Sequence, residues 1–458
     1  MTALIITLFV VGYLGIALEH SIKINKTAIA ILTGVICWTL FMFTTPGEDL
    51  LQSHDFQHFY RSLQSEASDS GEIDLSSEEL HREYVSFSLS EHLSDIAQIL
   101  FFLLGAMTIV ELVDAHKGFR FITERIKTTD LRALLWIISW TSFFLSSILD
   151  NLTTTIVMVS LIRKLVSDKN TKLMMVSMVV IAANAGGAWT PIGDVTTTML
   201  WIGGQISSLN IMKTLIVPSI VCILVPLIVL SFSKSIKGQQ LNKLPEETNG
   251  NDGGSGKLML AIGVGALVSV PVFKTLTHMP PYTGILLGLG ILWVVSEIIN
   301  PDMDEAVRRH YSVAGALSRV DVPSVLFFLG ILMAVGALES MQVLQQMARF
   351  LDDSLGNQQI IITLIGILSA VVDNVPLVAA SMGMYDMGNY PMDHMIWEYL
   401  AYCAGTGGSI LIIGSAAGVA AMGMEKIDFL WYAKKVSGLA LLGYFAGAIV
   451  YNLQHVFS

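Results

Sequence analysis

An internal repeat constrains the fold of this chain more than any other feature of its sequence. Three motifs recur in the same order, and each second copy lies 221 to 226 residues after the first. The pairs are FFLLGAMTIVELVD (101–114) with FFLGILMAVGALE (327–339), SSILDN (146–151) with SAVVDN (369–374), and GGAWTPIGD (186–194) with GGSILIIGS (407–415). Self-similarity at a nearly fixed offset predicts that the chain consists of two related halves.

Apolar segments long enough to cross a bilayer occur along the whole chain. Of its 458 residues, 53% are hydrophobic and only 14% are charged, whereas soluble proteins carry about 25% charged residues. A spanning helix needs roughly 17–25 mostly apolar residues. The composition excludes a soluble enzyme and predicts an all-α polytopic membrane protein. Spans are predicted near residues 2–18, 27–43, 92–115, 173–203, 211–233, 258–275, 282–299, 322–339, 395–424 and 428–452.

The apolar segment 131–163 differs from these spans because basic clusters flank it on both sides. Basic loops stay on the cytoplasmic side, so both ends of this segment are expected on that side. A segment that enters and leaves on one side is a re-entrant hairpin, and each arm is expected to be too short to need to cross. Its tip is LDNLT, with Asp150 near mid-bilayer, where non-helical backbone persists only against protein or water.

The two halves are expected to have opposite orientations in the membrane, because five crossings in each half form an odd number. The first repeat is 1–233 and the second is 258–458, joined by a cytoplasmic linker, 234–257. The second hairpin, about 357–386, has mainly acidic flanks and is expected to enter from outside. The distribution of basic residues places both termini outside, together with loop 44–91, which holds eleven acidic and two basic residues.

Each half also contains a helix that is expected to break inside the membrane. In the first, 173–203, two glycines and Pro191 interrupt ANAGGAWTPIGD, and in the second, 395–424, four glycines interrupt AGTGGSILIIGS. Inverted repeats with broken helices are typical of secondary transporters, whose substrate site lies near the midplane. Close helix packing is the alternative explanation of these glycines. Their matched positions beside the two hairpins favour interruption.

Three aspartates, Asp150, Asp194 and Asp373, lie deep in apolar sequence with no basic residue next to them. An ionised Asp at a helix centre costs about 2.5–3.5 kcal/mol on insertion scales. Such a carboxylate lowers its energy by taking a proton or by holding a metal cation, and one site cannot do both. If it faces each side in turn, it exchanges protons for cations. Capping of the second hairpin arms is the alternative role of the two Asp-Asn pairs.

The oxygen-bearing side chains near these aspartates suit a small hard cation, which prefers carboxylate, carbonyl and hydroxyl ligands. Besides the three aspartates, the candidate ligands are Ser146, Asn151, Thr154, Asn184, Thr190, Thr196, Thr197, Ser369, Asn374, Ser409 and Ser415. Thr154 is the weakest of them, because threonines in membrane helices often bond to their own backbone. Glu19 and His20, at the end of the first span, are candidate pH-responsive groups. No cofactor is expected.

At these residues the chain resembles the NhaD-type sodium/proton antiporters, in the superfamily that also holds arsenite and dicarboxylate carriers. The similarity runs through both halves and includes ALEHSIKINK, SSILDNLTTTIVMV, GGAWTPIGDVTTTMLW, VVDNVP and TGGSILIIGSAAGVAAMG. The resemblance implies export of Na⁺ and Li⁺ for incoming H⁺, a bacterial inner membrane, contact with membrane lipid, a homodimer, and no nucleic-acid partner. It carries functional roles to Asp150, Asn151, Asn184, Asp194, Thr196, Thr197, Asp373 and Asn374.

Two other functions fit parts of the sequence. A carrier of organic anions or arsenite on the same fold needs positive or neutral donors at the hairpin tips, whereas these tips start with Asp; arsenite carriers can also have acidic tips, so this alternative stays open. An intramembrane aspartyl protease also uses two membrane aspartates, one in a Gly-x-Gly-Asp motif. Here PIGD lacks the first glycine, and no Tyr-Asp motif lies in a predicted span. The chain is expected to be a transporter and not an enzyme.

Overall fold

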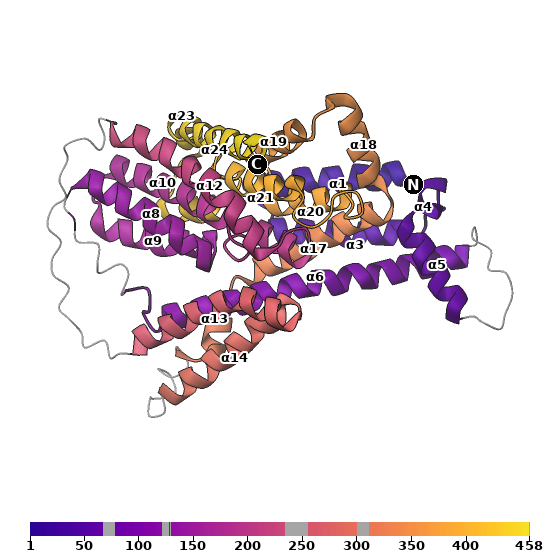
Figure 1. Cartoon of the computed structure of the whole chain (residues 1–458), viewed down its shortest axis with the longest axis horizontal. Coiled ribbons are helices and arrows are strands. Elements are labelled where there is room, and N and C mark those ends of the chain that lie inside the picture. The colour runs from indigo at the N-terminus through magenta and orange to yellow at the C-terminus, as the bar shows by residue number, and fades with distance from the viewer. Residues whose placement is uncertain (67–77, 121–127, 129, 234–254, 300–310, 458) are drawn as a thin grey trace. The chain divides into compact units, whose positions relative to one another are not determined.

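The computed structural model describes the chain outside residues 67–77, 121–127, 129, 234–254, 300–310 and 458. Every regular element in this described part is a helix (Figure 1). Eight of the described helices are long and apolar enough to cross a membrane, and four shorter apolar helices accompany them. The prediction of an all-α polytopic membrane protein is confirmed.

The described residues form two compact units, and each unit combines segments from both predicted repeats. Unit 1 comprises 1–100, 321–358 and 379–390, and unit 2 comprises 101–320, 359–378 and 391–458. The repeats are a property of the sequence, and their boundaries and inverted orientation stay a prediction. Most of the predicted linker, 234–257, lies outside the described residues.

Unit 1 combines helices from the first 100 residues of the chain with helices from the second predicted repeat. Its helices are α1 (Thr2–Ala17), α2 (Glu19–Ile22), α3 (Lys26–Phe41), α4 (Glu48–Leu51), α5 (His54–Glu66), the first part of α6 (Glu78–Ala115), α17 (Val322–Ser340), α18 (Val343–Leu355) and the end of α20 (Asn374–Met384). α3 packs along α17, where Gly34 lies against the backbone of Gly330. Trp38 Nε1 also donates a hydrogen bond to Met333 O at 2.8 Å. Small residues thus allow these two helices to approach closely.

The acidic segment 44–91 is more helical than the loop that the sequence predicted. α5 has 13 residues, and α6 begins at Glu78, well before the predicted span at 92. The sequence from 78 to 91 contains no Gly or Pro that would end a helix. At 1.5 Å per residue, the 38 residues of α6 extend over roughly 57 Å, which exceeds the roughly 30 Å thickness of the hydrocarbon core.

Unit 2 contains the first predicted hairpin, both predicted broken helices and residues 359–378 of the second predicted hairpin. Its helices, besides the end of α6 and the start of α20, are α8 (Leu131–Leu149), α9 (Asn151–Leu165), α10 (Lys169–Ala188), α11 (Val195–Ile202), α12 (Ser208–Ser231), α13 (Ser255–Thr277), α14 (Pro281–Ile299), α16 (Val313–Leu317), α19 (Gln358–Leu368), α21 (Met395–Gly407), α22 (Ala416–Glu425), α23 (Phe429–Lys435) and α24 (Ser437–Phe457). α10 packs against α8, α9 and α12, and these four helices lie side by side (Figure 1).

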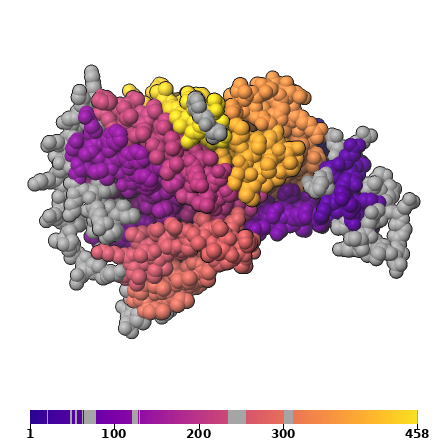
Figure 2. Space-filling model, viewed as in Figure 1, coloured from indigo at the N-terminus to yellow at the C-terminus, as the bar shows by residue number. Residues whose placement is uncertain are grey.

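The outer helices of unit 2 expose large apolar side chains. α13 and α14 pack on each other, and their surfaces are visible together in Figure 2. Val272 on α13 is 57% exposed, and Ile298 on α14 is 69% exposed. Large contiguous apolar surfaces are rare on soluble monomers, and here they match the lipid-facing surface expected of a polytopic membrane protein.

The first predicted hairpin is observed as two helices that meet at Asp150. α8 ends at Leu149 and α9 begins at Asn151. The backbone φ of Asp150 is 118°, a value that residues with a side chain rarely adopt. α8 has 19 residues and is long and apolar enough to cross a membrane, so the expectation that each arm is too short to cross is wrong for this arm. Entry and exit on one side stay a prediction.

Both predicted broken helices are interrupted at their glycine-rich motifs. The first is split between Ala188 and Val195, and the second between Gly407 and Ala416. The last residues of the two interruptions, Asp194 and Ser415, are equivalent in the repeat. Both are N-caps of the following helix, with φ −145° and ψ 143° or 155°.

Each hairpin is tied to the broken helix of its own half by an equivalent serine. Ser146 Oγ donates a hydrogen bond to Ala183 O at 2.6 Å, and Ser369 Oγ donates one to Ala404 O at 3.0 Å. Both serines are fully buried. The repeat seen in the sequence therefore extends to the hydrogen bonds that position the hairpins.

The first glycine of each doublet permits a close approach of hairpin and broken helix. A Cβ at Gly186 would overlap the carbonyl of Phe143, and a Cβ at Gly407 would overlap the carbonyl of Gly366. Both carbonyls belong to the backbone, which yields less easily than the end of a side chain. These two glycines lie next to the interruptions, and close packing of the hairpin on the broken helix also requires them.

Gly407→Ala tests this packing. The added methyl group would meet the backbone of α19, and overpacking of this kind costs about 1–3 kcal/mol. Thermal unfolding of the purified protein in detergent should begin at a clearly lower temperature than in the wild type. Gly423→Ala on α22 is the matched control, because a Cβ there meets no atom within 4 Å. Equal unfolding temperatures for the two variants would contradict the packing argument.

Candidate ion-binding site

The interrupted parts of the two broken helices meet inside unit 2 and gather polar side chains there. α10 packs against α21 and α22, and α9 packs against both α10 and α22. The side chains come from both predicted repeats, and each residue is no more than 4% exposed. We call these residues the crossing network: Asn151, Asn184, Asp194, Asn374, Ser409 and Ser415.

Asn184 on α10 joins the two halves of the chain within this network. Its Nδ2 donates hydrogen bonds to Ser409 Oγ and to Ser415 Oγ, both at 2.9 Å. Its Oδ1 accepts a hydrogen bond from Asn151 Nδ2 at 3.0 Å. One amide therefore holds the first hairpin tip and the second broken helix together.

Asp194 places a carboxylate among neutral donors. Its Oδ1 accepts a hydrogen bond from Asn151 Nδ2 at 3.2 Å. Its Oδ2 accepts one from Thr196 Oγ1 at 2.8 Å and one from Asn374 Nδ2 at 3.4 Å. The asparagines of both hairpin tips thus bind the same carboxylate. Since these three donors are uncharged, they solvate the carboxylate without neutralising it.

The contacts of the crossing network follow the two-fold relation of the repeat. Gly405 and Ser415 lie 221 positions after Asn184 and Asp194, respectively. Asn184 binds Ser415, and in the equivalent contact Gly405 lies next to Asp194, where a Cβ would be 3.1 Å from Asp194 Oδ2. The backbone arrangement is repeated while the side chains differ. The site therefore has a carboxylate on one side and a hydroxyl on the other.

The aspartates of the hairpin tips make different contacts from the neighbouring asparagines. Asp150, which is half-buried, accepts hydrogen bonds from Thr153 N at 2.7 Å and Thr153 Oγ1 at 2.9 Å. Asp373, also half-buried, accepts one from Val375 N at 3.4 Å, and its charge interacts with that of Asp194. Both aspartates therefore cap the second arms, as the alternative explanation predicted, and capping leaves their charge in place.

Comparison with known proteins identifies the family. A model of the citrate transporter family matches residues 2–407. Sodium/proton antiporter 1 of Arabidopsis thaliana is 48% identical over 98% of this chain and 72% of its own length, and sodium/proton antiporter 2 of the same plant is 44% identical over 98% and 99%. The Na⁺/H⁺ antiporter NhaD of Vibrio cholerae is 32% identical over 80% of each chain. The chain belongs to the NhaD-type sodium/proton antiporter family.

Membership of this antiporter family bears on three predictions: that the chain is not an enzyme, that it resembles NhaD-type antiporters, and that it lies in a bacterial inner membrane. The family consists of transporters, so the expectation that the chain is not an enzyme is confirmed. The resemblance identified from the motifs is confirmed as well. The relatives come from a plant and from bacteria, so the bacterial inner membrane stays a prediction.

Four of the predicted ligand residues of this antiporter bind backbone carbonyls. Thr190 Oγ1 donates to Ser147 O at 2.7 Å, which ties the first interruption to the first hairpin tip. Thr197 Oγ1 donates to Ala188 O at 3.4 Å across the same interruption. Together with Ser146 and Ser369, these residues hold the backbone of the site in position.

Thr154 is fully buried, and its hydroxyl has no hydrogen-bond partner in the described structure. Threonines in membrane helices often donate a hydrogen bond to a backbone carbonyl of their own helix. Thr154 makes no such bond in the described structure. Leaving a buried hydroxyl unpaired costs about 1–3 kcal/mol. A hydroxyl in this state is available to a ligand.

At the end of the first span, the structure describes the side chain of Glu19 but not that of His20. Glu19 Oε1 accepts a hydrogen bond from Lys26 N at 3.0 Å within unit 1. This contact fixes the turn that leads into α3. The side chain of His20 lies outside the described residues, and its pH-responsive role stays a prediction.

Two residues that the sequence did not single out make contacts within unit 2. Thr198 Oγ1 donates a hydrogen bond to Pro191 O at 2.9 Å inside the first interruption. The threonine-rich segment after Asp194 was the available signal. Glu425 at the end of α22 binds Arg163 and Lys172 from α9 and α10. Its partners lie far away in sequence, so no local pattern indicated them.

Asn184→Ala tests whether the crossing network holds unit 2 together. The change removes the hydrogen bonds of Asn184 to Asn151, Ser409 and Ser415, and lost buried hydrogen bonds of this kind cost about 1–3 kcal/mol. We expect a lower unfolding temperature in detergent. Thr155→Val is the control, because it removes a buried hydroxyl that has no partner in the described structure while keeping the shape of the side chain. Equal loss of stability in both variants would show that the network contributes nothing.

Proposed function

We propose that this protein exchanges Na⁺ for H⁺ across a membrane and that the crossing network with the two hairpin tips holds the transported ion. The observation that carries the proposal is the buried carboxylate of Asp194, whose hydrogen bonds come from neutral donors only among the described residues. A buried carboxylate without a counter-charge is stabilised by a proton or by a cation. Several relatives of this chain are named sodium/proton antiporters.

The side chains of the site divide between proton carriers and neutral ligands. Asp150, Asp194 and Asp373 are the groups that take up and release protons. The neutral oxygens available to the cation are the amide oxygen of Asn184 and the unpaired hydroxyl of Thr154, with the serines and asparagines of the crossing network around them. Oxygen ligands of this kind suit a small hard cation. No cofactor takes part, because the exchanged ions themselves occupy the carboxylates.

The interrupted helices support an alternating-access cycle. The site lies where both helices are interrupted, and movement of one repeat against the other around such a site changes the side from which it is reached. In this cycle Na⁺ or Li⁺ from the cytoplasm displaces protons from the carboxylates and is released outside. Protons from outside then bind the carboxylates and are released into the cytoplasm. We propose with it the re-entrant hairpins and external termini, which the distribution of charged residues predicts. A homodimer and a bacterial inner membrane, which the sequence resemblance implies, belong to the same proposal.

An organic-anion carrier is the second candidate, and the match to the citrate transporter family favours it. The chemistry of the crossing network argues against it. A carboxylate surrounded by neutral donors attracts cations and repels a tricarboxylate, because like charges in a poorly solvated site repel strongly. The uncharged form of arsenite would avoid this repulsion, so arsenite belongs among the substrates to be tested.

Proton flux in everted vesicles separates these functions. A preset pH gradient should collapse when Na⁺ or Li⁺ is added, and the effect should strengthen from pH 7 to pH 10 as protons compete less well for the carboxylates. Parallel samples receive K⁺, and others receive labelled citrate, succinate or arsenite. Uptake of one of the labelled compounds without Na⁺-dependent proton flux would replace the antiporter proposal by the second candidate.

Asp150→Asn separates charge from capping at the first hairpin tip. Asn caps a helix about as well as Asp, so the variant should fold and reach the membrane while Na⁺-dependent proton flux falls to background. The matched control is Asp168→Asn at the exposed start of α10, where Asp168 accepts a hydrogen bond from Thr171 N at 2.8 Å as Asp150 does from Thr153. That control should retain wild-type flux.

The charge of Asp168, the residue changed in the control variant, is constant over the pH range of the assay. Hydrogen bonds from the backbone and the hydroxyl of Thr171 hold the pKa of Asp168 below its ordinary value, so this carboxylate remains ionised from pH 7 to pH 10. If Asp150→Asn and Asp168→Asn transport equally well, Asp150 is only a cap and its proposed role is wrong.

A further inference from the structure

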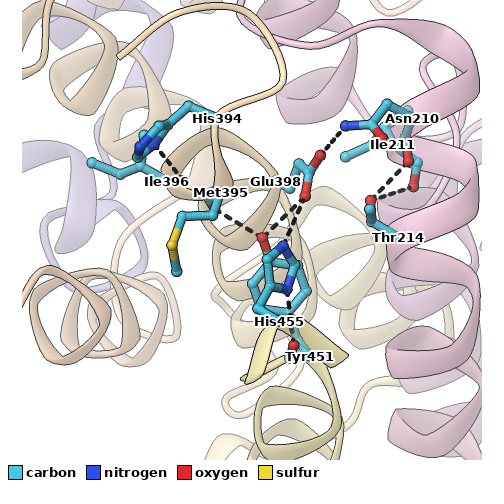
Figure 3. Close-up of polar contacts among 9 residues, drawn as sticks. All are labelled: Asn210, Ile211, Thr214, His394, Met395, Ile396, Glu398, Tyr451 and His455. Carbon is cyan, nitrogen blue, oxygen red and sulfur yellow. Dashed lines mark hydrogen bonds and ion pairs between the residues drawn. The ribbon is translucent and has the colours of Figure 1, made fainter. Parts of the chain in front are cut away.

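A second buried carboxylate lies at the start of α21, outside the crossing network. Glu398 is 1% exposed, and residues of two other helices bind it (Figure 3). Asn210 and Thr214 come from α12, and Tyr451 and His455 come from α24. Neither the sequence motifs nor the proposed transport cycle gives this group a role.

Glu398 is held by donors on both of its oxygens (Figure 3). Oε1 accepts a hydrogen bond from Asn210 Nδ2. Oε2 accepts one from Tyr451 OH at 3.1 Å and lies 3.7 Å from His455 Nε2. The Tyr451 hydroxyl also lies 2.9 Å from Met395 O, and its single proton cannot serve both acceptors at full strength. Oε2 therefore depends on His455.

The protonation of His455 follows from what its two ring nitrogens face. Nδ1 lies 3.1 Å from Tyr451 O, a carbonyl that can only accept, and Nε2 faces the carboxylate of Glu398. A neutral imidazole carries one N–H and cannot donate to both. One additional proton, either on the imidazole or between the imidazole and the carboxylate, would serve both contacts. The pair is therefore built to hold a proton.

The groups around His455 and Glu398 favour the presence of the additional proton. His455 lies in the last turn of α24, where a positive charge interacts favourably with the helix dipole, and its ring contacts Tyr451 at 4.3 Å. The other titratable groups facing the pair are Tyr399, stacked on Tyr451, and Asp393, whose charge acts on Glu398. Asn210 and Thr214 on α12 are uncharged. Among these described neighbours, the only positive charge available to Glu398 is the proton on His455.

We propose that Glu398 and His455 form a second proton-binding site, which holds α21 against α12 and α24 while it is protonated and releases α21 as the pH rises. The consequence for transport rests on the proposed function. α21 runs without interruption from Glu398 to the glycines of the crossing, a distance of about 10 Å over two turns. Gly405, at that end, lies against Asp194. A restraint at the start of α21 therefore acts on the ion-binding site.

The direction of the pH effect follows from the charges. The ion pair requires the additional proton, so its stabilisation is present at acidic pH and is lost at alkaline pH, where the pair has released that proton. Transport is therefore held back at acidic pH and released toward alkaline pH.

Thermal unfolding of the purified, detergent-solubilised protein tests the proton site without requiring transport. Unfolding temperatures are measured from pH 5.5 to pH 9 for the wild type, His455→Gln and His278→Gln. His278 follows α13 and is exposed, so its variant is the matched control. The wild type and the control should be more stable than His455→Gln at acidic pH and should converge with it at alkaline pH. A constant difference, or none, at all pH values would overturn the proposal.

Na⁺-dependent proton flux in vesicles then tests the link to transport. His455→Gln and Glu398→Gln should each shift the acidic limb of the pH profile toward lower pH with an unchanged maximal rate, and the double variant should shift it no further. Profiles that superimpose on that of His278→Gln would refute the link. If the wild type shows no Na⁺-dependent flux, the proposed function fails, whereas the unfolding comparison still decides whether the proton site exists.

Discussion

Asp194 keeps a carboxylate buried where two broken helices meet, and the neighbouring segments supply the donors that make this burial tolerable. Both hairpin tips contribute an asparagine to it, from opposite halves of the chain. These neutral donors replace part of the water that the carboxylate loses, but they leave its charge. We propose that a proton or a small cation balances this charge. This charge balance connects the fold to ion exchange.

The rest of unit 2 can be understood as support for that arrangement. Gly186 and Gly407 let the hairpins approach the broken helices closely, and Ser146 and Ser369 fix each contact with one hydrogen bond to a backbone carbonyl. The backbone geometry is repeated in the two halves, but the side chains at the crossing are not. Serine stands at position 415, where the first half has an aspartate. The duplicated fold thus provides two similar half-sites, of which only one carries a carboxylate at the crossing.

Local signals in the sequence predicted the elements of the site well. The Asp-Asn pairs marked both hairpin tips, and the glycine doublets marked both interruptions, because strained or interrupted backbone needs particular residues. Contacts between distant segments were not predictable in this way. Nothing near Asn151 indicates that its amide binds Asp194 and Asn184. Glu398 and His455 are 57 positions apart, and only the packing of α21 on α24 brings them together.

The proposed exchange requires that sodium and protons occupy the same buried carboxylates and exclude each other. Calorimetric titration of the purified protein with Na⁺, in two buffers that differ in ionisation enthalpy at one pH near neutrality, measures proton release directly. The account predicts that Na⁺ binding releases protons, seen as a heat that changes with the buffer, and that the release disappears in Asp194→Asn. Na⁺ binding with the same heat in both buffers would contradict it, because cation and proton would then occupy separate sites.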